Sequence, residues 1–113
     1  MVTHRAAMAP GKMLGWRNAG REDAMKAILL SRTGDPSVLD YVDVPTPRPG
    51  DGEVLVRADT IGVSMPELLV RRGTYAWMPP LPAIPGIEMS GTIVECGRAV
   101  ADRAVGDLSL IHI

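Results

Sequence analysis

The sequence predicts a small, mainly β domain with one short helix. Ten prolines and twelve glycines in 113 residues imply many turns, and therefore short strands. Several segments alternate apolar and polar residues, which is the period of a half-buried strand. Only residues 64–73 carry both the start and the stop signals of a helix. A chain of this length has room for one domain.

The expected strands are short apolar or alternating segments separated by turn residues. Gly34-Asp35-Pro36 has the composition of a turn, and the prolines at 45, 47 and 49 prevent regular pairing between two of the strands. Gly62 is expected to mark a bend or bulge near the end of the longest strand. Strands are expected at residues 26–30, 40–44, 53–63 and 87–96.

The helix is expected to begin after Ser64 and to end before Gly73. Ser64 and Glu67 have the spacing of a capping box. Pro66 lies in the first turn, where its missing N–H leaves no helical hydrogen bond unmade. Gly73 is typical of the residue that follows a helix, because it tolerates the left-handed conformation.

Composition and charge make several functional classes poor candidates. The net charge of −1 gives no reason to expect nucleic acid or an anionic membrane surface as a partner. No apolar run approaches the roughly 20 residues of a membrane-spanning helix. Cys96 is the single cysteine, so an intramolecular disulfide and a multi-cysteine zinc site are excluded. One cysteine and no signal-like N-terminus favour a cytoplasmic location.

The sequence divides into three parts. Residues 1–24 hold four basic residues against two acidic ones without periodicity, so we expect a disordered or mis-started extension, with Met25 as the better start. A transit peptide is the alternative. Residues 25–107 form the coherent domain. Residues 108–113, Leu-Ser-Leu-Ile-His-Ile, are expected to be non-native, because one frame of a transposon-end library adapter encodes them; a natural apolar strand is the alternative.

The order of motifs in residues 62–91 resembles the N-terminal GroES-like domain of the medium-chain dehydrogenase/reductase superfamily. The resemblance depends on a strand ending in Gly-Val, a short helix, a proline-rich loop, and the sequence Gly-Ile-Glu-Met-Ser-Gly at 86–91. It implies an incomplete GroES-like barrel over residues 25–107. The 113 residues contain no Gly-x-Gly-x-x-Gly between a strand and a helix, so the Rossmann domain of the superfamily is absent from this sequence.

Two positions place the resemblance in the zinc-free quinone oxidoreductase branch. Alcohol dehydrogenases of the superfamily have a zinc-ligating cysteine just after the Gly-Val strand end and a zinc-ligating histidine in Gly-His-Glu. Ser64 and Ile87 stand at these positions. Neither side chain can replace a thiolate or an imidazole, so the resemblance implies an enzyme without zinc.

The resemblance also implies roles for four residues. Ser64 would lie beside the nicotinamide as a catalytic or cofactor-binding group, although helix capping is its simpler role. Tyr75 would hydrogen-bond the substrate oxygen and stabilise its developing charge, or would anchor the loop by its ring. Arg72 would contact a cofactor phosphate or be a solvated helix end. Trp77 would line the substrate pocket or cover the core.

Three residues of the Gly-x-Glu-x-x-Gly motif are expected to be structural. Gly86 and Gly91 would allow close approach of the backbone. Glu88 would make a structural hydrogen bond to backbone rather than act as an acid or base.

The function implied by the resemblance is that of an NADPH-dependent quinone oxidoreductase. Hydride would pass from the nicotinamide to a quinone or another α,β-unsaturated carbonyl, and the whole enzyme could be a homodimer. The 113 residues would form the substrate side of the cleft and would be inactive alone, since the cofactor is bound mainly by the missing domain. The alternatives are a stand-alone GroES-like binding or oligomerisation module and a fragment of a zinc-free enoyl-thioester reductase.

Overall fold

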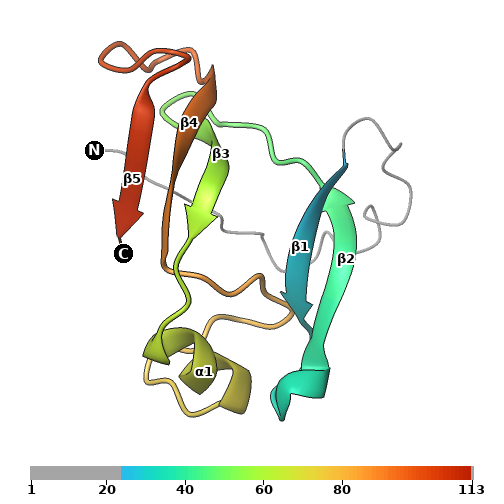
Figure 1. The fold of residues 1–113 in the computed structure, drawn as a ribbon. Helices are drawn as coiled ribbons and strands as arrows, with labels where there is room; N and C mark the ends of the chain where they lie inside the picture. Colours follow the sequence, from blue (N-terminus) through green and yellow to red (C-terminus); the bar gives the residue numbers. More distant parts are fainter. Residues whose placement is uncertain (1–23, 113) are drawn as a thin grey trace. The chain divides into compact units, whose positions relative to one another are not determined.

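The computed structural model describes residues 24–112, and the expectations for residues 1–23 and 113 lie outside them. The described part is mainly β with one short α-helix, as predicted (Figure 1). It forms two compact units, of residues 24–46 with 64–85 and of residues 47–63 with 86–112. The elements are β1 (Ala24–Leu30), η3 (Pro36–Val38), β2 (Leu39–Pro45), β3 (Val54–Ile61), α1 (Met65–Arg72), β4 (Glu88–Cys96) and β5 (Leu108–His112).

The first unit is built on an antiparallel pair of strands, β1 and β2. Their register runs without interruption from Ala24 opposite Pro45 to Leu30 opposite Leu39. The turn predicted at Gly34-Asp35-Pro36 is tightened into the 3-10 helix η3, and Asp35 is its N-cap. The proline-rich loop after α1 returns to this sheet, where Leu30 and Ala83 exchange two backbone hydrogen bonds of 2.8 and 3.0 Å.

A small apolar cluster joins the helix of this unit to its strands. Leu30, Val38 and Val70 are its buried members, and Leu30 is completely excluded from solvent. Full burial of a side chain of this size stabilises the fold by about 1.5–3 kcal/mol. Tyr75, Met78 and Leu81 pack against the cluster from the loop after α1. The cluster therefore fixes the position of α1 and its following loop against β1.

The second unit is a three-stranded antiparallel sheet in the order β3-β4-β5 (Figure 1). Two bulges interrupt the pairing of β3 with β4, one of them between Ala58 and Thr60, where Asp59 is left out of the register. Of the bend or bulge predicted at Gly62, the bulge thus lies three residues earlier, and the bend stays a prediction. Gly62 follows the strand, and a Cβ there would lie 2.1 Å from Glu88 Oε1.

Gly91 allows β3 and β4 to approach closely, as predicted. A Cβ at Gly91 would lie 2.1 Å from the backbone oxygen of Arg57 and 3.0 Å from the Cα of Ala58. The prediction for Gly86 was wrong, because nothing lies within 4 Å of a Cβ at that position. Gly86 has instead a φ of +144°, which L side chains rarely adopt.

The segment expected to be a non-native tail is paired in the structure. Leu108–His112 form β5, and its register with β4 runs from Thr92 opposite Leu108 to Glu88 opposite His112. An apolar pentapeptide beside an open strand edge will pair with it whatever its origin. The adapter origin of these codons stays a prediction about the DNA.

Candidate functional site

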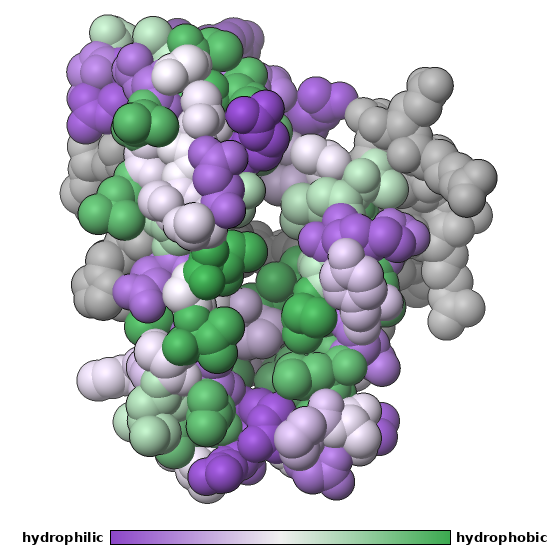
Figure 2. All heavy atoms as spheres, in the orientation of Figure 1, coloured by the Kyte–Doolittle hydropathy of each residue, from purple (hydrophilic) through white to green (hydrophobic). Residues whose placement is uncertain are grey.

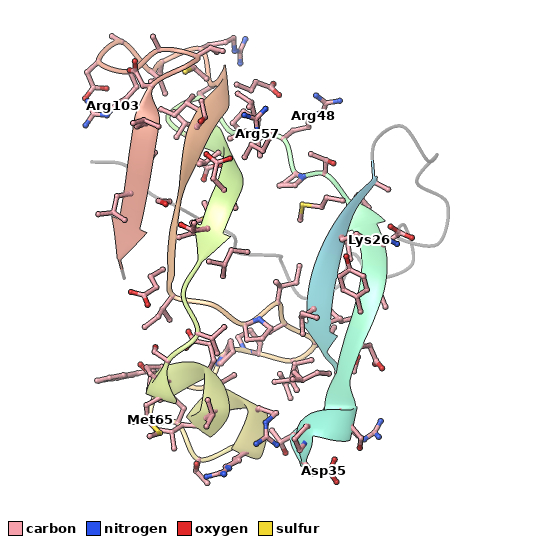
Figure 3. The ribbon with its side chains drawn as sticks, in the orientation of Figure 1. Lys26, Asp35, Arg48, Arg57, Met65 and Arg103 are labelled. Atoms are coloured by element: carbon pink, nitrogen blue, oxygen red, sulfur yellow. The ribbon has the colours of Figure 1, made fainter. Side chains whose placement is uncertain are left out.

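The first turn of α1 is organised by Ser64 and Glu67, which form the predicted capping box. Glu67 Oε2 accepts the backbone N–H of Ser64 at 2.7 Å, and the same oxygen accepts the Ser64 hydroxyl at 2.9 Å. Both residues are partly buried. Met65 follows as the first residue of the helix and is labelled in Figure 3.

This geometry changes what the Ser64 side chain can offer a ligand. Capping by the hydroxyl oxygen alone would have left its proton free to donate. In the structure the Ser64 hydroxyl donates its proton in a hydrogen bond to the Glu67 carboxylate, which when ionised can only accept. The Ser64 oxygen is also the capping-box acceptor of the N3 backbone N–H, so one lone pair is left to accept a hydrogen bond from a ligand N–H or O–H.

The last turn of α1 ends as the sequence predicts. Gly73 is in the left-handed conformation with a φ of +78°, and its N–H donates to the carbonyl of Val70 at 3.0 Å. Arg71 and Arg72 occupy the last turn, where positive charge complements the helix dipole. Arg71 is half-buried and donates from its guanidinium to the carbonyl of Gly34, whereas Arg72 is exposed.

Tyr75 and Trp77 form an edge-to-face aromatic pair in the loop after α1. Their ring centroids are 5.7 Å apart and their planes are inclined at 80°. Tyr75 packs against the apolar cluster, and its hydroxyl has no hydrogen-bond partner within the described part of the chain. Trp77 is 79% exposed. Tyr75 is thus anchored by its ring, and its hydroxyl remains able to bind a ligand; the catalytic role itself stays a prediction.

The helix and its following loop also present apolar side chains to solvent. Met65 is 62% exposed and Leu68 36%, and with Trp77 they form what we call the α1 face. Figure 2 shows apolar residues at the surface over this part of the molecule. Single exposed apolar residues are common, whereas a contiguous exposed apolar patch is typical of a binding surface.

Residues of the Gly-x-Glu-x-x-Gly motif belong to the other compact unit. The backbone carbonyl of Glu88 accepts the N–H of Gly62 at 3.2 Å, which continues the pairing of β3 with β4 past the end of β3. The side-chain hydrogen bond expected of Glu88 stays a prediction. Ile87 precedes β4 and is half-buried. Within residues 24–112, no group of three His, Cys, Asp or Glu side chains is placed to hold a metal ion.

Sequence reasoning missed one polar contact of this site. Gly34 and Arg71 are linked by two hydrogen bonds, one from the Gly34 N–H to the Arg71 carbonyl at 2.8 Å and one from the Arg71 guanidinium to the Gly34 carbonyl. The available signals were the Gly-Asp-Pro turn and the Arg-Arg pair at the helix end. Neither signal says that the two segments meet.

Among residues 24–112, no helix has both the length and the apolar character needed to span a membrane.

Comparison with known proteins identifies relatives over most of the described residues. Residues 50–112 match the model of the alcohol dehydrogenase GroES-like domain. The chain is 40% identical over 65 residues to the synaptic vesicle membrane protein VAT-1 homolog of Rattus norvegicus, covering 58% of this chain and 16% of that protein. It is 37% identical over 84 residues to the quinone oxidoreductase of Lama guanicoe, covering 74% of this chain and 26% of that protein.

A relative of a different activity matches over a similar length. The NAD-dependent alcohol dehydrogenase of Sulfolobus acidocaldarius is 39% identical over 92 residues, covering 77% of this chain and 26% of that protein. The matching segment therefore does not by itself choose between a quinone oxidoreductase and an alcohol dehydrogenase.

Solved structures share the fold. The human VAT-1 homolog-like protein superposes with a TM-score of 0.75 at 30% identity, covering 80% of this chain and 29% of that one. The Escherichia coli quinone oxidoreductase complexed with NADPH superposes with a TM-score of 0.71 at 29% identity, covering 76% of this chain and 26% of that one. The chain thus spans between 16% and 29% of the length of the relatives named here. On the family match and these likenesses, the chain belongs to the alcohol dehydrogenase GroES-like domain family of the medium-chain dehydrogenase/reductase superfamily.

Proposed function

We propose that this chain is the substrate-side domain of a zinc-free, NADPH-dependent quinone oxidoreductase. The observation that carries the proposal is the Ser64–Glu67 pair at the start of α1. Where the zinc enzymes of the superfamily place a thiolate, this chain has a hydroxyl already bonded to a carboxylate. Ile87 stands where those enzymes have an imidazole. These two side chains supply no zinc ligand.

The proposed roles of the site residues follow from their contacts. When bound, NADPH would supply hydride to a quinone or another α,β-unsaturated carbonyl. Ser64 would accept a hydrogen bond from the cofactor amide, since its hydroxyl already donates to Glu67. The Tyr75 hydroxyl would donate to the carbonyl oxygen that becomes negative, and the packing of its ring would keep this donor in place.

The α1 face would provide the apolar surface on which the flat substrate lies. Met65, Leu68 and Trp77 are exposed and apolar, and an aromatic side chain can stack on a quinone ring. Arg72 would contribute positive charge toward cofactor phosphate. We place this enzyme in a reducing cytoplasm, where its one cysteine, Cys96, remains a thiol.

The 113-residue chain alone is proposed to be inactive. Residues 24–112 contain no Rossmann-type unit that could bind the nicotinamide cofactor. The test is to measure NADPH oxidation with a simple benzoquinone, using the purified chain and, in parallel, the complete reading frame from which it derives. Turnover by the longer protein that a zinc chelator does not reduce supports the proposal. Turnover by the 113-residue chain, with host reductases excluded, would overturn the inactivity.

A second candidate function is a stand-alone module that binds a protein or oligomerises. It is favoured by strand β5, an edge of its sheet, where Leu108 is 87% and Leu110 79% exposed. Apolar edge strands without charged residues readily pair with another chain. Light scattering of the purified chain separates the candidates, because a module of this kind forms a defined oligomer and loses it when Leu110 is replaced by Lys.

A further inference from the structure

An open hollow of about 390 Å³ lies between the β1–η3 connection and the last turn of α1. Its lining residues belong to one compact unit, so their mutual arrangement is defined. Asp35, on the η3 side, is labelled in Figure 3. The lining residues are Gly34, Asp35, Pro36, Arg71 and Arg72.

The two sides of the hollow are tied together. Gly34 and Arg71 are joined by the two hydrogen bonds described above, one in each direction, although they are 37 residues apart in sequence. A Cβ at Gly73 would lie 2.9 Å from Thr33 Cγ2, so the helix end is also packed closely against this connection. The hollow is therefore part of the folded unit and does not depend on one loose side chain.

The charge around the hollow is unbalanced. Among residues 24–112 there are eight Lys and Arg side chains, and five of them lie within 4.0 Å of a carboxylate. The other three are Arg32, Arg71 and Arg72. Arg71 and Arg72 line the hollow, and Arg32 lies close enough for its charge to help lower the pKa of Asp35. The described cations that lack a carboxylate partner thus gather at this one place.

Asp35 is the one acidic side chain of the lining, and it already has a structural partner. Its Oδ1 accepts the backbone N–H of Ser37 at 2.8 Å, which caps η3. One carboxylate against three guanidinium groups leaves an excess of two formal positive side-chain charges. A ligand with two negative charges would complete the balance.

We propose that this hollow binds the phosphate monoester group of a small molecule. The planar guanidinium groups of Arg71 and Arg72 match the oxygens of a phosphate, and Arg32 adds to the attraction. The hollow is shallow and largely open to solvent, so a bound phosphate would leave space beside it. The remaining space, beside Pro36 and the arginine stems, suits the carbon part of an ester. Arg72 is shared with the proposed contact to cofactor phosphate, so at that residue the inference rests on the proposed function, but binding itself requires no hydride transfer.

The experiment is a titration of the isotopically labelled 113-residue chain, followed by the backbone amide signals of Gly34 and Gly73. The probes are inorganic phosphate, NADP⁺ and NAD⁺ at constant ionic strength. NADP⁺ and NAD⁺ differ by one phosphate monoester, so they form a matched pair. We expect saturable shifts with NADP⁺ and with inorganic phosphate, and weaker binding of NAD⁺. Equal binding of the two dinucleotides together with saturable phosphate binding would support free phosphate as the ligand and overturn the ester.

Three variants locate the site. Arg72→Gln changes an exposed side chain, so it should leave the fold intact and weaken phosphate binding about tenfold, which corresponds to about 1.4 kcal/mol. Asp35→Asn keeps an oxygen for the Ser37 N–H but removes a negative charge, so it should tighten binding about threefold. Arg98→Gln is the matched control, since Arg98 pairs with Asp51 in the other compact unit.

Three results would overturn the proposal. One is the absence of saturable shifts with every probe. Another is unchanged binding in Arg72→Gln. A third is equal weakening in Arg98→Gln, which would show that only the overall charge matters. Failure of quinone reduction by the complete protein would leave these binding results unaffected, so the two proposals fail separately.

Discussion

Glu67 Oε2 accepts both the backbone N–H and the hydroxyl of Ser64, at 2.7 and 2.9 Å. One carboxylate oxygen thus satisfies an N–H at the start of α1 and fixes the direction of the Ser64 hydroxyl. This pair links the fold to the proposed chemistry, because it commits the Ser64 hydroxyl proton to Glu67 and leaves only the oxygen for a ligand.

Replacing Glu67 by Ala should destabilise the protein by about 1–2 kcal/mol, because the N–H and hydroxyl of the N-cap Ser64 lose their shared acceptor. Unfolding in urea followed by circular dichroism measures the change. Glu95→Ala is the control, since Glu95 forms an exposed ion pair with Arg48 at 3.4 Å and such pairs contribute about 0–1 kcal/mol. Equal losses in the two variants would contradict the importance of the cap.

Gly91→Ala should prevent normal pairing of β3 with β4. The new Cβ would meet the backbone oxygen of Arg57 at 2.1 Å, and backbone cannot move aside as a side chain can. We expect a loss of about 3 kcal/mol or more, or no folded sheet. Gly52→Ala is the matched control, because nothing lies within 4 Å of a Cβ there. Backbone amide NMR spectra of both variants show whether the sheet forms. A normal sheet in Gly91→Ala would contradict the structure.

Two substitutions at Tyr75 distinguish the packing of its ring from the proposed chemistry of its hydroxyl. Tyr75→Phe keeps the ring against the apolar cluster and should change the free energy of unfolding by less than about 0.5 kcal/mol. Tyr75→Ala should lower it by about 2 kcal/mol, since the half-buried ring is removed. In the complete enzyme, Tyr75→Phe should lower kcat for quinone by about tenfold or more, through loss of a charge-stabilising donor. An unchanged kcat would leave Tyr75 as a loop anchor alone.

Asp35 should give the protein an acid-dependent component of stability. Its pKa is lowered by hydrogen bonding to Ser37, and more weakly by the charges of Arg71 and Arg32. Because the folded-state pKa lies below the unfolded one, the stabilisation is present above the ordinary value of 3.8 and is lost as pH falls through the folded pKa. Carboxylate NMR measures this pKa directly. Ser37→Ala should move it part of the way back, and an unmoved pKa would contradict the assigned cause.

Much of the fold was predictable because its signals are local. Alternation placed β2 within about one residue of each end, and the Ser64-to-Gly73 pattern placed α1 with both of its caps. The sequence also predicted that Gly91 is needed for close approach. These features depend on neighbouring residues in the chain, so a sequence pattern can reveal them.

The features of the fold that the sequence did not predict depend on contacts between segments far apart in the chain, which no local pattern contains. Gly86 and Gly91 look alike in sequence, yet one is needed for its positive φ and the other for space beside β3. The bulge lies at Asp59 because of the pairing with β4, whereas glycine composition pointed to Gly62. The hollow depends on Gly34 meeting Arg71 across 37 residues. Each of these follows from tertiary pairing rather than from propensity.

The most direct test of the central claim is to sequence the source DNA beyond codon 113, express the complete reading frame and assay it. We expect a frame that continues into a dinucleotide-binding domain, and a product that oxidises NADPH with a quinone in the presence of a zinc chelator. A frame that stops after Ile113, or a product that needs zinc and acts on alcohols, would contradict this expectation.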